Sequence, residues 1–88
     1  MIIGIKNFMQ TKTIQFQNLN YTIKPFNAVD GVIIFHVLKP SQNANVLDLA
    51  VMYGWVNKKL IDLTARNNEN SSLLDACRQY ILSVYTLN

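Results

Sequence analysis

The 88-residue sequence has little of what most catalytic chemistry and most covalent scaffolds require. It contains one cysteine, Cys77, one histidine, His36, and five acidic residues that are spread along the chain. A single cysteine cannot form an intramolecular disulfide, so a secreted disulfide scaffold is not predicted. The first residues lack the basic region, the apolar length and the cleavage site of a signal peptide. Because no apolar run approaches the ~20 residues of a membrane span, we expect a cytoplasmic protein that does not enter a membrane.

Motifs for catalysis and ligand binding are equally scarce. Nucleophilic catalysis needs a nucleophile beside a base, and only His36 with Cys77 could supply that pair. Cys77 falls on the apolar stripe of a predicted helix, where a buried and inert thiol is the usual case. The sequence has no Cys-x-x-Cys, His-x-x-x-His or Asp-x-Asp-x-Asp spacing for a metal, and its three glycines are too far apart for a phosphate loop. We therefore predict no enzyme, no cofactor and no metal site.

Charge is low, and what there is of it is not clustered. The net charge is +3 and the pI about 9.2, yet the basic residues are scattered apart from the pair Lys58–Lys59. Binding to a nucleic-acid backbone usually requires several neighbouring cations, so a nucleic-acid partner is not expected. Half of the residues are hydrophobic and 15% are charged, which favours an apolar face that a partner covers. The alternative is that the many Asn and Gln residues solvate the surface.

The first recognisable element is a β-hairpin over residues 11–25. Apolar and polar residues alternate with a period of two, which is typical of half-buried strands; the apolar positions are Ile14, Phe16, Leu19, Tyr21 and Ile23. Asn18 and Asn20 suit the tight turn between the strands. Pro25 is expected to end the second strand because it lacks an N–H for the ladder. Residues 1–10 are either a strand or a disordered lead-in.

Helices are predicted over most of residues 27–88. Asn27 can cap a helix that runs to about Leu38 before Pro40, although its β-branched content leaves a strand over residues 28–38 open as the alternative. Residues 45–66 carry apolar side chains at spacings of three and four, as does a last helix that Ser71 or Ser72 can cap. The predicted fold is α+β: one small domain over residues 1–88, with an N-terminal hairpin followed by about three helices.

The predicted helix over residues 45–66 has more apolar surface than one stripe, which suggests a protein contact. Two residues apart on a helix, Tyr53 and Trp55 would lie about 200° apart around the axis. Since Tyr53 shares the stripe of the core, Trp55 is predicted to be exposed at an interface. The candidate interface residues are Val51, Trp55 and Leu47.

Residues 12–28 resemble the opening of bacteriophage tail assembly chaperones. Those proteins begin with a short strand, a turn and an aromatic strand of the form Tyr-x-Ile-x-Pro, followed by a helix start rich in small residues. Here Tyr21, Ile23, Pro25 and Ala28 match that pattern. The resemblance implies a non-enzymatic factor in the host cytoplasm that binds the tape measure protein or the tail tube subunits. It implies no catalytic residues.

Two other functions remain open at this point. A self-assembling structural or virion component would account for the low charge and would form stable oligomers without a partner. A small nucleic-acid-binding regulator would account for the pI, but the scattered lysines argue against it.

Overall fold

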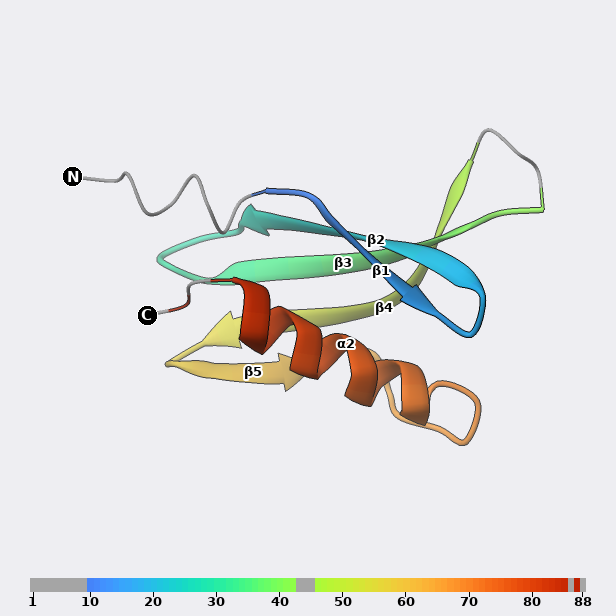
Figure 1. The fold of residues 1–88 in the computed structure, drawn as a ribbon. Coiled ribbons are helices and arrows are strands. Elements are labelled where there is room, and N and C mark those ends of the chain that lie inside the picture. The colour runs from blue at the N-terminus through green and yellow to red at the C-terminus, as the bar shows by residue number, and fades with distance from the viewer. Residues whose placement is uncertain (1–9, 43–45, 86, 88) are drawn as a thin grey trace.

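In the residues that the structure describes, the polypeptide forms five antiparallel strands followed by one helix (Figure 1). The computed structural model describes residues 10–42, 46–85 and 87. Each strand pairs with the next in the chain, so the sheet order is β1-β2-β3-β4-β5. The elements are β1 (Lys12–Phe16), β2 (Leu19–Asn27), β3 (Ile33–Pro40), β4 (Leu47–Val56), β5 (Lys59–Asp62) and α2 (Ser71–Val84). The sheet curls into a half-barrel, and α2 lies across its concave side.

Three tight turns of the same kind connect the strands. Each has two successive residues with positive φ, as a type I′ turn requires; the pairs are Gln17 (50°) and Asn18 (66°), Asp30 (47°) and Gly31 (80°), and Asn57 (52°) and Lys58 (62°). In the second turn the Val32 N–H donates to the Val29 carbonyl at 2.8 Å. Type I′ turns match the right-handed twist of paired strands, so these three turns direct the chain into consecutive hairpins.

The core lies between the concave side of the sheet and α2. Alternate strand residues are buried there against the helix: Tyr21, Ile23, Ile33, Phe35, Val37, Val51, Tyr53 and Leu60 from the sheet, and Leu73, Leu74, Cys77 and Ile81 from α2. Tyr53 donates a hydrogen bond from its hydroxyl to the Leu74 carbonyl at 2.6 Å, so its one polar atom is satisfied inside the core. The predicted burial of Cys77 is confirmed.

The predicted hairpin and final helix are present, with some differences in detail. Strands β1 and β2 form the hairpin, but β2 continues through Pro25, which pairs with Phe35. The pairing of β1 with β2 ends at Lys12 and Ile23. Pro25 lies beyond that ladder, so its lack of an N–H removes no hydrogen bond to β1. Helix α2 begins at Ser71 with Asn70 as its N-cap, and neither serine caps it. Residues 1–9 of the predicted lead-in lie outside the described residues.

The predicted helix over residues 27–38 is wrong. Its residues form the end of β2, a turn and β3, which pairs with β2 on one side and β4 on the other. The strand alternative holds because the β-branched residues of this segment favour an extended chain. The pair Asp30-Gly31 is a strong hairpin signal, whereas the helical interpretation placed both residues inside a helix that Asn27 would cap.

The predicted helix over residues 45–66 is also wrong, and with it the α+β hairpin-and-helices fold. Strands β4 and β5 occupy this segment and meet at the Asn57-Lys58 turn. Spacings of three and four were fortuitous, because so many residues here are apolar that they fit either period. The period that governs the structure is two, with Val51 and Tyr53 buried on the concave side. The described part of the chain is mostly β, with one C-terminal helix.

Candidate protein-binding surface

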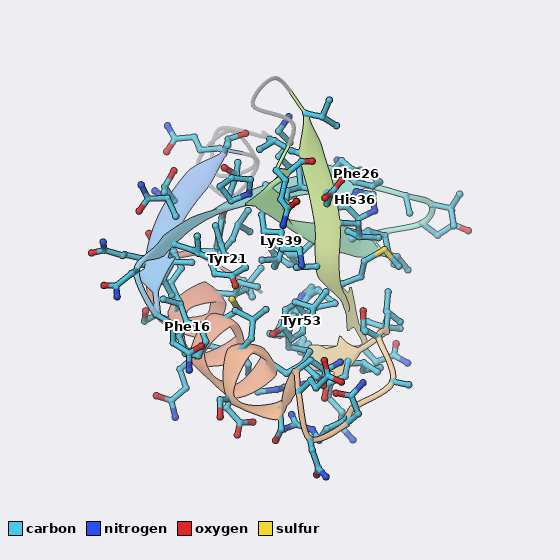
Figure 2. The ribbon with its side chains drawn as sticks, turned by 90° about the vertical axis from the view of Figure 1, so that its right-hand side faces the viewer. Phe16, Tyr21, Phe26, His36, Lys39 and Tyr53 are labelled. Atoms are coloured by element: carbon cyan, nitrogen blue, oxygen red, sulfur yellow. The ribbon has the colours of Figure 1, made fainter. Side chains whose placement is uncertain are left out.

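The convex face is the side of the sheet that points away from α2. Strand alternation places a second set of side chains there, one residue out of step with the core. Figure 2 shows Phe26 and His36 on this side, whereas Tyr21 and Tyr53 point toward the helix. The rings of Phe26 and His36 meet edge to face with centroids 4.7 Å apart. The convex face therefore has ordered side chains of its own that contribute nothing to the core.

The apolar side chains of the convex face come from the end of β2, from β3, β4 and β5, and from the residue that follows β5, whereas β1 and the rest of β2 are polar there. The apolar patch of this face consists of Phe26, Ile34, Met52, Ile61 and Leu63. Of these, Phe26 is 38% exposed, Ile61 44% and Leu63 46%. Even if each side chain had the roughly 150–250 Å² of a large aromatic residue, exposed fractions of this size would amount to at most about 500 Å² for the five together. A patch of this size on a small protein often has a function.

Gly54 is at the centre of the apolar patch and shapes it. A Cβ built on Gly54 would lie 3.3 Å from Cδ1 of Leu63, so the leucine side chain rests directly on the glycine backbone. Leu63 is held there because its N–H donates to the Met52 carbonyl at 2.9 Å, which extends the β4–β5 ladder by one residue. The Met52 N–H donates in turn to Oγ1 of Thr64 at 2.8 Å. Gly54 therefore leaves room for the Leu63 side chain to lie across the backbone of β4.

Helix α2 covers backbone groups at both edges of the half-barrel. At the β1 edge, the Tyr80 hydroxyl donates to the Thr13 carbonyl at 3.2 Å, and the Tyr85 hydroxyl to the Gln10 carbonyl at 2.8 Å. At the β5 edge, the Arg78 guanidinium donates to the Leu60 carbonyl at 2.6 Å. An open sheet edge is the usual template for adding a strand, and here side chains of α2 occupy part of each edge.

The ion pairs of the described residues lie on the helix side of the sheet. Asp62 accepts hydrogen bonds from Arg78 and Arg66, and Arg66 also contacts Asp75 at 3.0 Å. Burial alone would raise the pKa of Asp62, but the hydrogen bonds from the two arginines outweigh it and lower that pKa. The guanidinium of Arg78 also lies over the Tyr53 ring, 5.8 Å from its centroid. These pairs attach α2 to β5 and leave the convex face without them.

The predicted interface residues do not come together. Val51 is fully buried in the core and has no exposed surface for a partner. Trp55 lies on the concave side of β4 and packs against the core, because residues two apart in a strand point the same way. Leu47 is 45% exposed, at the end of β4 that extends beyond β5. The convex residues Ile61 and Leu63 had been placed in a helix, so periodicity alone did not separate them from the core.

In the described residues, the two candidates for nucleophilic catalysis do not come together. His36 and Cys77 lie on opposite sides of the sheet, so they cannot act as a base and a nucleophile. Burial raises the pKa of the Cys77 thiol to about 11, which keeps it protonated near neutral pH. Within the described part of the chain, no three metal-binding side chains come together and no helix is long and apolar enough to cross a bilayer.

One cavity opens at the end of the half-barrel next to the start of α2. It has a volume of about 300 Å³, and Phe16, Tyr21, Lys39, Glu69 and Leu73 are among its lining residues. Figure 2 shows Phe16, Tyr21 and Lys39 around this opening. The rings of Phe16 and Tyr21 pack edge to face with centroids 6.3 Å apart. Its charges are one exposed lysine and one exposed glutamate, so none of the charged groups that line the cavity is buried.

No protein-family model, curated protein or solved structure matches this chain. The apolar patch of the convex face is the feature of the described residues that points most directly to a function.

Proposed function

We propose that this chain is a non-enzymatic protein-binding factor that contacts its partner through the apolar patch. The observation that carries the proposal is the exposure of Phe26, Ile61 and Leu63 on the side of the sheet that faces away from the core. Their burial by a partner would release water from apolar surface, which is the main driving force of association. The absence of a convergent polar or metal-binding cluster in the described residues favours binding over catalysis.

The kind of factor that we propose is a bacteriophage tail assembly chaperone, with the tape measure or tail tube protein as the partner. Support comes from the resemblance at Tyr21, Ile23 and Pro25, all of which lie in β2. The helix start that the resemblance implies at Ala28 is replaced by the β2–β3 turn. The proposal thus depends on the strand part of the motif together with the apolar patch.

Two measurements test this function. The gene should lie beside genes for a tape measure protein and a tail tube protein, and the purified chain should bind one of those proteins in sedimentation experiments. Ile61→Gln should weaken that binding at least tenfold, because central apolar contacts often contribute about 2 kcal/mol or more. Leu82→Gln is the matched control, since Leu82 is 50% exposed on α2.

A different gene neighbourhood would refute the tail role, and equal binding by the two variants would refute the surface. Concentration-dependent oligomers that Ile61→Gln abolishes, with no binding to the tail proteins, would instead favour the self-assembling structural component.

A further inference from the structure

Charge on the convex face is of one sign. Its strand positions include Lys24 on β2 and Lys59 on β5, both exposed, but no aspartate or glutamate. Asp48 of β4 pairs with Lys39 beyond the β-bulge and therefore shares the concave side with that lysine. Asp62 points to the helix side, where it pairs with Arg78, and Asp30 lies beyond the patch at the tip of the β2–β3 turn. Neither lysine takes part in the described ion pairs. The apolar patch is therefore flanked by two cations that are available to a partner.

The strand register fixes where these two cations lie. Lys24 pairs with His36 and His36 with Met52, so Lys24 is level with the Met52 end of the patch. Lys59 pairs with Val56, four residues further along β4. At about 3.3 Å per residue, the two lysines are offset by about 13 Å along the strands. Neighbouring strands are about 4.8 Å apart. Lys24 on β2 therefore lies about 7 Å to one side of the line midway between β3 and β4, and Lys59 on β5 lies about 7 Å to the other side.

Two kinds of occupant fit this face poorly. A second copy in a two-fold dimer would bring the same patch and the same lysines together, with no carboxylate on either side to pair with them. The patch also falls well below the ~800 Å² per partner of a standard stable interface. An added β-strand would need an open sheet edge, but α2 already bonds to the carbonyls of Thr13 and Leu60.

An amphipathic α-helix fits the same geometry. A helix with side chains is about 10–12 Å wide, so one lying along β3 and β4 would bring its flanks close to both lysines. An offset of 13 Å corresponds to about nine residues at 1.5 Å per residue. Over nine residues an α-helix completes about two and a half turns, so two side chains nine residues apart lie on opposite flanks of the helix.

Building on the proposed function, we propose that the apolar patch binds an amphipathic helix of a partner protein that has carboxylates on opposite flanks about nine residues apart. One carboxylate would pair with Lys24 and the other with Lys59. Between them, an apolar stripe would lie against Phe26, Ile34 and Ile61. Opposite-charge contacts at an interface rim mainly set orientation and partner choice, so the two lysines would select the partner and the direction in which it lies.

Labelled 18-residue model helices test this inference by fluorescence anisotropy with the full chain. One peptide has a leucine stripe and two glutamates nine residues apart, on opposite flanks. A second has the same composition with the glutamates seven residues apart, on one flank, and a third replaces both glutamates with lysine. We expect the first to bind about tenfold more tightly than the third and about threefold more tightly than the second, with both ratios reduced by added salt.

Protein variants assign the effect to the two lysines. Lys24→Glu and Lys59→Glu should each reduce the preference for the glutamate peptide, and the double variant should reverse it, whereas Lys39→Glu should leave it unchanged. Equal affinity for all three peptides, with binding still weakened by Ile61→Gln, would overturn the charge inference and leave the proposed surface in place. Failure of every peptide to bind, or binding that Ile61→Gln does not alter, would refute both. Dimers that Ile61→Gln dissociates would mean that a second copy occupies the patch.

Discussion

Replacing Gly31 with alanine separates the β2–β3 hairpin from a helix in this segment, because the two structures predict opposite signs. In the type I′ turn Gly31 has φ +80°, and a Cβ built there meets nothing within 4 Å. The cost is therefore that of the left-handed backbone alone, about 1–2 kcal/mol for a residue with a Cβ. In a helix interior, the same substitution would stabilise the protein by about 0.8–1.0 kcal/mol.

Urea unfolding followed by Trp55 fluorescence measures this difference. Gly31→Ala should lower the free energy of unfolding by about 1–2 kcal/mol, which for a domain of this size lowers Tm by roughly 4–15 °C. Gly31→Asn is the control, because asparagine adopts positive φ more easily and should retain most of the stability. A stability gain for Gly31→Ala would refute the hairpin and the strand order built on it.

Three further predictions concern the core and its titration. Tyr53→Phe should cost about 1 kcal/mol, since it removes one buried hydrogen bond to the Leu74 carbonyl but leaves the ring in place; a loss above 3 kcal/mol in urea unfolding would contradict this. Trp55→Ala should cost about 2–4 kcal/mol because its half-buried ring packs against the core, and an unchanged Tm would show that the ring faces solvent. The pKa of Cys77 is raised from 9.0 to about 11, so below pH 9 the thiol is neutral in both states, whereas above it the unfolded chain ionises first. The free energy of unfolding should therefore fall from pH 9 to 11, with a shallower decline for Cys77→Ala, and an identical decline in both proteins would argue against a buried thiol.

Some elements follow from local sequence. Alternation over residues 12–23 was sufficient to predict the first hairpin, because half-buried strands bury every second residue. The apolar stripe with Leu74, Cys77 and Ile81 predicted α2 and the burial of its thiol, because residues three and four apart share a helix face. Both segments have polar residues between the apolar ones, and this contrast is what makes their periods readable.

Residues 27–62 lack that contrast, since their strands are covered by α2 on one side and have apolar side chains on the other. Where both sides are apolar, spacing cannot distinguish a strand from a helix, and the useful signals were the turn residues Asp30-Gly31 and Asn57-Lys58. The apolar patch depends on the fold still more strongly. Phe26 and Ile61 are far apart in the sequence, and they share a surface only because strand register carries β2 and β5 onto one curled sheet. Side-chain type is local information, but the face that a side chain occupies depends on its pairing partners, and those are set by the tertiary structure.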